Sequence, residues 1–258
     1  MRRRHDRCSF TGMRIHRVPG LMAHSYLIET PEALFLVDGG MAGTGRKILK
    51  RIAEIGRKPE QLLFALVTHG HADHFGGLAE VQDASGCSIL CHASHAETVS
   101  TGGSIVSPGL NGFGKIYERI ANFAVPRLKL PSLRRVLTVE DGTELHRFGL
   151  PGRILFTPGH SSGDLTLVLD DGAAFVGDLV QGCRIPRVTP PEFSIMAVDE
   201  PAMFASWKLL IESGAKVIYP GHGAIVTLEE IVPVFRRAVA RRARQALRLP
   251  AATGRSQA

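Results

Sequence analysis

The most informative segment of the chain reads Thr68-His69-Gly70-His71-Ala72-Asp73-His74. It follows an apolar run at 62–67, which predicts a buried strand that ends in a loop of ligand-type side chains. Imidazole and carboxylate are the groups that zinc and similar divalent ions prefer. His69 and His71 leave the strand two residues apart, so both can reach one ion. Asp73 and His74 begin the next helix and point elsewhere, so this one loop can serve two metal ions.

Three more candidate ligands stand further along the chain, each directly after an apolar run and beside a glycine: His160, Asp178 and His222. Polar residues that follow buried strands lie in the loops where chemistry usually takes place. A lone histidine in such a place is more often structural. Their joint occurrence with the 68–74 segment, however, favours a metal centre.

The rest of the pattern predicts the order of strands and helices. Apolar or alternating runs predict strands at 25–29, 33–37, 62–67, 88–91, 135–139, 144–148, 153–157, 165–169, 173–176 and 217–219. Helices are expected at 44–55, 74–82, 201–212 and 228–249. A Gly- and Pro-rich segment of about 102–131, with a helix at 116–125, is expected to be an insertion over the site. Strands and then a helix occur twice, which predicts an α/β (α+β) fold with two sheets face to face between helices, a four-layer αββα sandwich.

Length, composition and charge limit the classes of protein. The 258 residues, 44% hydrophobic and 21% charged, are typical of a globular chain and exclude a disordered or fibrous one. We divide them into a basic extension at 1–17, a single domain at 18–249 and a tail at 250–258. The net charge of +7 resides in the ends, since the body of the chain is mildly acidic. We therefore expect a small-molecule substrate, no nucleic-acid partner and, without an apolar run of signal-peptide or membrane-span length, a cytoplasmic protein.

The segments between 24 and 223 resemble the metallo-β-lactamase superfamily, and this resemblance implies the αββα sandwich. Residue by residue, it implies a first metal on His69, His71 and His160, a second metal on Asp73, His74 and His222, and a bridge between them at Asp178. We expect two divalent ions as cofactors, zinc in the first place, with iron or manganese as alternatives.

Three further residues have two interpretations each. Asp38, at the end of the 33–37 strand, either holds a ligating histidine by its free ring nitrogen or is a turn aspartate. His24 precedes the first hairpin strand and either contacts substrate at the mouth of the site or packs. Arg184, in the loop after the bridging aspartate, either meets an anionic substrate or is solvated.

The resemblance implies a hydrolase in which hydroxide between the two metals attacks the carbonyl of an ester, thioester or lactone. Asp73 is expected to orient this nucleophile and then carry a proton to the leaving group. The ligand set is similar to those of glyoxalase II and the homoserine-lactone lactonases, but the tyrosine that the lactonases place soon after the bridging aspartate is missing. Because Asp178 stands where the commonest metallo-β-lactamases carry a cysteine, antibiotic hydrolysis is not expected as the main activity.

Two other activities stay open. A persulfide dioxygenase binds a single iron at a similar motif, and one iron per chain with oxygen uptake would favour it. A ribonuclease Z-type phosphodiesterase is favoured by the basic ends but opposed by the acidic body. The last helix, at 228–249, is basic and amphipathic, so it either lies on a membrane surface or packs on a sheet with its arginines in water. The oligomeric state is left open.

Overall fold

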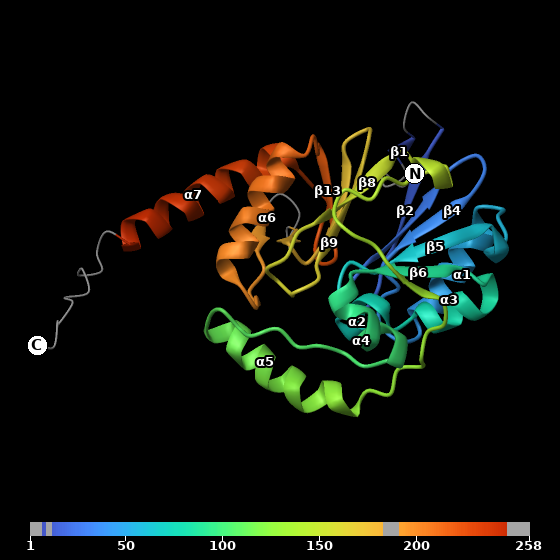
Figure 1. Ribbon diagram of the computed structural model, residues 1–258, viewed down its shortest axis with the longest axis horizontal. Coiled ribbons are helices and arrows are strands. Elements are labelled where there is room, and N and C mark those ends of the chain that lie inside the picture. Colours follow the sequence, from blue (N-terminus) through green and yellow to red (C-terminus); the bar gives the residue numbers. More distant parts are fainter. Residues whose placement is uncertain (1–6, 9–11, 183–190, 247–258) are drawn as a thin grey trace, which may run out of the picture.

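The first half of the chain builds a seven-stranded sheet in the computed structural model, which describes residues 7–8, 12–182 and 191–246 (Figure 1). Its strands follow one another in space as they do along the chain: β1 (Arg7–Cys8), β2 (Arg14–Val18), β3 (Ser25–Glu29), β4 (Leu34–Val37), β5 (Leu62–Leu66), β6 (Ser88–Cys91) and β7 (Val136–Thr138). β1 to β4 pair antiparallel, whereas β4 to β7 pair parallel. The carboxyl ends of β4, β5 and β6 therefore share one edge.

The second half builds a five-stranded sheet in the order β14-β13-β10-β9-β8. These strands are β8 (Gly152–Phe156), β9 (Leu165–Leu169), β10 (Ala173–Gly177), β13 (Val217–Pro220) and β14 (Val226–Thr227). β10 and β13 run parallel, so the loops that leave them also meet at one edge. A separate short pair joins β11 (Val180–Gln181) to β12 (Glu192–Phe193).

Apolar side chains of both sheets form the central core. Tyr26 of β3 packs edge to face on Phe175 of β10, with ring centroids 5.4 Å apart, and also on Tyr219 of β13. The Tyr26 hydroxyl donates to the carbonyl of Pro220 at 2.7 Å, so its one polar atom is satisfied inside the core. This packing fixes the two sheets face to face and aligns their loop-bearing edges.

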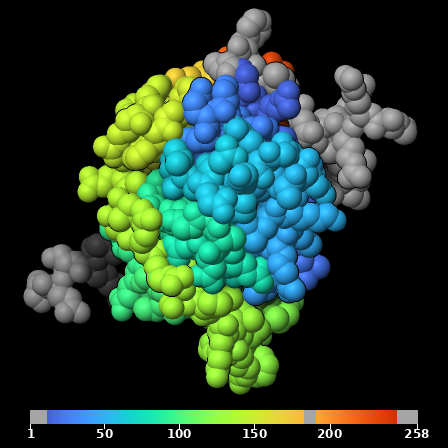
Figure 2. All heavy atoms as spheres, turned by 90° about the vertical axis from the view of Figure 1, so that its right-hand side faces the viewer, coloured from blue at the N-terminus to red at the C-terminus, as the bar shows by residue number. Residues whose placement is uncertain are grey.

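Helices cover the outer face of each sheet. On the first sheet lie α1 (Thr44–Glu54) and α3 (Leu78–Ser85), through buried residues such as Ile48, Ile52 and Val81, and they occupy much of the face seen in Figure 2. On the second sheet lies α6 (Glu200–Glu212), and α7 (Leu228–Ala246) begins beside it and extends away from the sheets (Figure 1); their buried Trp207 and Ile231 belong to a third apolar cluster. The predicted four-layer αββα sandwich is therefore confirmed.

Two predicted elements differ from the structure. The strand expected at 144–148 is wrong: Glu144 forms an isolated bridge with Arg153, and His146–Phe148 is a 3-10 turn that ends at Gly149. The helix expected at 74–82 is divided into α2 (Ala72–Phe75) and α3. Gly77, between these two helices, packs closely on the loop that follows β4, since an added Cβ at this position would lie 2.4 Å from the carbonyl oxygen of Gly39.

Other boundaries shift. Residues 14–17 of the predicted basic extension lie in β2, which pairs with β3 along its length. α4 (Ala96–Thr101) directly precedes the insertion, and the insertion contains α5 (Gly112–Ala124), which begins four residues before the predicted helix. Asn111 caps α5, because its side chain accepts from the backbone N–H of Gly114 at 2.8 Å. Within the described ranges, none of the helices combines the length and the apolarity needed to cross a membrane.

Candidate metal centre

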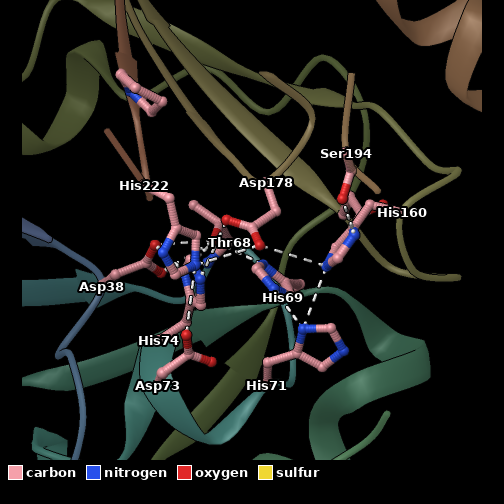
Figure 3. A network of polar contacts seen from close by, with 12 residues as sticks. Asp38, Thr68, His69, His71, Asp73, His74, His160, Asp178, Ser194 and His222 are labelled. Atoms are coloured by element: carbon pink, nitrogen blue, oxygen red, sulfur yellow. Dashed lines mark hydrogen bonds and ion pairs between the residues drawn. The ribbon is translucent and has the colours of Figure 1, made fainter. Parts of the chain in front are cut away.

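Loops from both sheets meet at one edge of the sandwich, where the predicted ligands lie together (Figure 3). The seven residues come from the loop after β5, from α2, and from the ends of β8, β10 and β13: His69, His71, Asp73, His74, His160, Asp178 and His222. They form two groups, and within each group the ligand atoms lie within 4.8 Å of one another. The structure thus brings together every residue that the sequence predicted as a ligand.

The first group is His69, His71, His160 and Asp178. Nδ1 of His71 lies 3.0 Å from Nε2 of His69 and 3.1 Å from Nε2 of His160. Asp178 approaches the same point, with Oδ2 3.7 Å from Nε2 of His160. Three imidazole nitrogens and one carboxylate oxygen therefore converge on a single point.

The second group is Asp73, His74 and His222. Nε2 of His222 lies 3.3 Å from Oδ2 of Asp73 and 3.4 Å from Oδ2 of Asp178. The other oxygen of Asp178, Oδ1, lies 3.3 Å from Nε2 of His74. The Asp178 carboxylate therefore stands between the two groups and faces both.

Burial keeps His69 and His71 of the first group neutral. Burial, together with the imidazoles of His74 and His71, lowers the pKa of His69 well below its ordinary value. Burial and the neighbouring His160 lower the pKa of His71 to about 3. A neutral imidazole is the form that binds a metal ion, so these rings are already in the ligand form.

The carboxylates of Asp73, in the second group, and of Asp178, beside it, both stay ionised. Although burial raises the pKa of Asp73, the hydrogen bond from His222 and the charge of His74 bring it down to about 2. Burial also opposes ionisation of Asp178, but the same two histidines hold its pKa well below the ordinary range. The carboxylates in turn raise the pKa of His222 to about 10, against the effect of burial. The two ionised carboxylates favour positive charge beside them, which His222 supplies here and a metal ion would supply when bound.

Two atoms of this pocket test whether the residues fit a metal ion. Nε2 of His74 and Oδ1 of Asp178 are buried and face each other at 3.3 Å, and neither makes a hydrogen bond within the described part of the chain. A buried polar atom without a partner costs about 1–3 kcal/mol, and a cation between these two would satisfy both. Imidazole nitrogens and carboxylate oxygens are also the donor types that zinc, iron and manganese accept. The residues therefore fit two divalent ions.

In His160 and His71, the ring nitrogen that faces away from the first group contacts a neighbouring residue, and this contact orients the ring. Nδ1 of His160 donates to the carbonyl of Met196 at 2.9 Å and lies 2.9 Å from the Ser194 hydroxyl. Nε2 of His71 lies 3.2 Å from the hydroxyl of Ser107. Such contacts fix the tautomer and leave the other nitrogen of each ring for a metal.

Asp38 holds His74 in the same way. Its Oδ2 accepts from Nδ1 of His74 at 2.7 Å, and its Oδ1 accepts from the backbone N–H of Thr68 at 2.8 Å. Asp38 has a left-handed backbone with φ of 58°, a costly conformation for a residue other than glycine. Of the two interpretations of Asp38, this geometry corresponds to the one in which Asp38 holds a histidine of the site by its free ring nitrogen.

His24, another candidate, is not among the described residues that line the centre. His24 donates its backbone N–H to the carbonyl of Gly221 at 2.8 Å, and its ring contacts Arg17. Burial and the Arg17 charge lower the pKa of His24 to about 4. Arg184 lies outside the described residues.

A cavity of about 290 Å³ opens over both groups, and the insertion forms one of its walls. Tyr117 of α5 lines it together with Phe113, Met22 and Ser194. Burial and the carboxylates of Asp73 and Asp178 raise the pKa of Tyr117 to about 12, so its phenol stays protonated. Sequence reasoning missed Tyr117, although a tyrosine inside the predicted insertion over the site was a signal that could have found it.

The segment around His160 also matches a pattern that marks serine nucleophiles in other enzymes, Gly-x-Ser-x-Gly, over residues 159–163. Its central residue, Ser161, is fully buried, and its hydroxyl donates to Asp164. This serine stabilises the loop that carries His160 and does not face the cavity.

The comparisons with known proteins define the family of this chain. A model of the metallo-beta-lactamase superfamily matches residues 18–222, and the chain belongs to that superfamily. Among solved structures, the Rm3 metallo-beta-lactamase superimposes with a TM-score of 0.66 over 95% of this chain and 96% of that one. Its sequence identity is 19%, so this likeness concerns the fold alone.

Similar curated proteins carry several different activities in their names. The exodeoxyribonuclease WalJ of Streptococcus pneumoniae is 44% identical over 59 residues, 23% of this chain and 21% of WalJ. A hydroxyacylglutathione hydrolase of Rhodopseudomonas palustris is 30% identical over 56% of this chain and 44% of its own length. The atrochrysone carboxyl ACP thioesterase of Aspergillus fumigatus is 25% identical over 81% of this chain and 54% of its own length. The chain thus matches between about a fifth and about half of the length of these relatives.

Proposed function

We propose that this protein is a binuclear hydrolase that cleaves a carboxylic ester, thioester or lactone, with zinc as its metal. The observation that carries the proposal is Asp178, whose two oxygens lie 3.3 Å from Nε2 of His74 and 3.4 Å from Nε2 of His222, while Oδ2 also faces His160 at 3.7 Å. Two relatives, a hydroxyacylglutathione hydrolase and an acyl-carrier thioesterase, favour a thioester among these bonds.

The seven ligand residues would hold two ions, the first on His69, His71 and His160 and the second on Asp73, His74 and His222, with Asp178 shared. When bound, such ions supply hydroxide at neutral pH and polarise the carbonyl of the substrate. Asp38 and Ser194 keep the rings of His74 and His160 in their ligand orientations.

Two residues of the cavity wall would act on the substrate. The Asp73 carboxylate, ionised and beside His222, would take the proton of the nucleophile and pass it to the leaving group. The Tyr117 phenol, which stays protonated, would donate a hydrogen bond to the oxygen on which charge develops. Phe113 and Met22 provide apolar contact for the remainder of the substrate.

The test is the Asp178→Ala variant with a panel of nitrophenyl esters, acyl thioesters and lactones. Asp171→Ala is the matched control, because Asp171 precedes the same strand β10 and holds only a turn, accepting from the backbone N–H of Ala173 at 3.0 Å. We expect Asp178→Ala to abolish hydrolysis and lower the metal content, and Asp171→Ala to keep both. Full activity in Asp178→Ala would refute the bridging role.

A phosphodiesterase is the second candidate, favoured by the 44% identity to the exodeoxyribonuclease over 59 residues. The same metal-loaded protein would be assayed with bis(p-nitrophenyl) phosphate and with single- and double-stranded DNA. Turnover of these substrates that exceeds turnover of every ester, and that falls with Asp178→Ala, would place the phosphodiesterase first.

A further inference from the structure

Helix α5 presents an apolar face to solvent. Its large side chains Phe113, Ile116, Ile120 and Phe123 are 61%, 57%, 61% and 66% exposed. They recur every three or four residues, so they lie along one side of the helix. α5 lies at the border of the molecule in Figure 1, and the lime-green atoms of this region project from the lower edge in Figure 2. Contiguous exposed apolar residues of this size usually mark a binding surface.

The side of α5 that faces the protein is a different one. Tyr117 lines the metal cavity, and Gly114 packs closely on the backbone of Ile195. Glu118 accepts from the backbone N–H of Gly109 at 2.9 Å. The helix is therefore held in place through its inner side.

Positive charges border this apolar face. Lys115, Arg119, Arg127 and Lys129 are all exposed, whereas Glu118 is the single acidic residue between 110 and 130 and is engaged with Gly109. The Arg127 guanidinium lies 3.9 Å from the centre of the Phe123 ring, so cation and aromatic ring form one unit. An amphipathic helix with aromatic and aliphatic residues on one face and lysine and arginine beside them is typical of helices that lie in a membrane interface.

We propose that this face of α5 binds an anionic phospholipid membrane surface. The apolar side chains would enter the boundary between headgroups and acyl chains, and the four cations would meet lipid phosphates. A second copy of the chain fits less well, because a twofold contact through this face would bring the same four cations towards one another.

The position of the face links membrane binding to the metal centre. Phe113 belongs to both, since it lines the cavity and is largely exposed beside Ile116. An ester or thioester with an acyl chain could then pass from the lipid surface into the cavity. This consequence rests on the proposed hydrolase function, whereas the membrane binding itself does not.

The experiment is flotation of the full chain with vesicles of phosphatidylcholine alone and of equal parts phosphatidylcholine and phosphatidylglycerol. The variant is Ile120→Ser with Phe123→Ser, two residues that do not line the cavity. The control is Leu137→Ser with Leu63→Ser, residues of the first sheet that are 51% and 45% exposed. We expect binding to the anionic vesicles that decreases with salt, and a partition coefficient about tenfold lower in the α5 variant than in the control.

Three results would overturn the proposal. These are equal binding of both variants, equal binding to neutral and anionic vesicles, and a wild-type dimer in light scattering that the α5 variant converts to a monomer. The first result would assign any vesicle binding to the basic ends of the chain. The last would assign the face to a second copy. Because flotation needs no catalysis, failure of the hydrolase proposal would leave this test intact.

Discussion

Replacement of Asp38 by asparagine should weaken one metal site and spare the other. In the native protein, Oδ1 of Asp38 accepts from the backbone N–H of Thr68 at 2.8 Å and Oδ2 accepts from Nδ1 of His74 at 2.7 Å. In Asp38→Asn, the amide oxygen has to stay on the Thr68 N–H, because two donors cannot face each other. The new NH₂ group then donates to Nδ1 of His74. The ring proton moves to Nε2, the atom that faces Asp178 and would bind the metal.

The magnitude follows from the burial and charge of this contact. Both side chains are buried, so water cannot replace the lost interaction. A hydrogen bond to a charged group contributes about 1.5–3 kcal/mol. Loss of a partner that orients a metal ligand typically lowers metal affinity about 10- to 100-fold, which is about 1.4–2.8 kcal/mol and agrees with that range. The first group, built around His71 and His160, should keep its affinity.

The assay is a competition titration of the apoprotein with zinc and a chromophoric chelator, fitted to two sites. Asp141→Asn is the matched control, because Asp141 also accepts a backbone N–H, from Phe156 at 2.8 Å, and lies outside the centre. We expect one unchanged and one weakened site in Asp38→Asn and two unchanged sites in the control. Wild-type affinity at both sites of Asp38→Asn would refute the reasoning, and equal weakening in both variants would indicate a general loss of stability.

Three more outcomes are expected. Tyr117→Phe should lower kcat about 100-fold at full metal content. Because the pKa of Tyr117 is raised to about 12, its phenol should cause no loss of activity between pH 7 and about pH 11. A decrease of activity in that pH range that disappears in Tyr117→Phe would contradict the role of Tyr117 as a hydrogen-bond donor. Cys87 and Cys91 should resist iodoacetamide at pH 8 in the folded protein and react in guanidinium, because burial raises the pKa of both thiols, that of Cys91 to about 11. Peptide mapping by mass spectrometry measures the extent of alkylation at each cysteine. Rapid labelling without denaturant would argue against the burial of this strand. Gly221→Ala should lower zinc affinity at least about tenfold in the chelator titration, because the new Cβ would lie 2.5 Å from the ring of His74. Unchanged zinc binding would show that the backbone at residue 221 can move without displacing His74.

The cluster of candidate ligands could be predicted because their spacing and their place after apolar strands are both local features of the sequence. His160 and Asp178 each follow a strand of the second sheet, and the pairing of β10 with β13 brings Asp178 beside His222. The resemblance to one superfamily then assigned each residue to one of the two groups. The four-layer fold could be predicted for a similar reason, since the order of elements repeats.

Features that depend on contacts between distant segments could not be predicted. Tyr117 lies in the predicted insertion, but it reaches the cavity only because α5 folds back over the site, and that contact depends on the fold. The division of the 74–82 helix depends on how closely Gly77 approaches Gly39, a contact between two layers. The strand expected at 144–148 was wrong because its alternating pattern belongs to a 3-10 turn, and Leu145, which directly precedes that turn, enters the core.

The most direct test of the account is the metal content per chain, measured by elemental mass spectrometry on protein purified without chelator. Two groups of ligands that share Asp178 predict close to two ions per chain, with zinc as the main element. One iron per chain, together with oxygen consumption in the presence of a persulfide, would contradict the binuclear hydrolase and support a mononuclear dioxygenase.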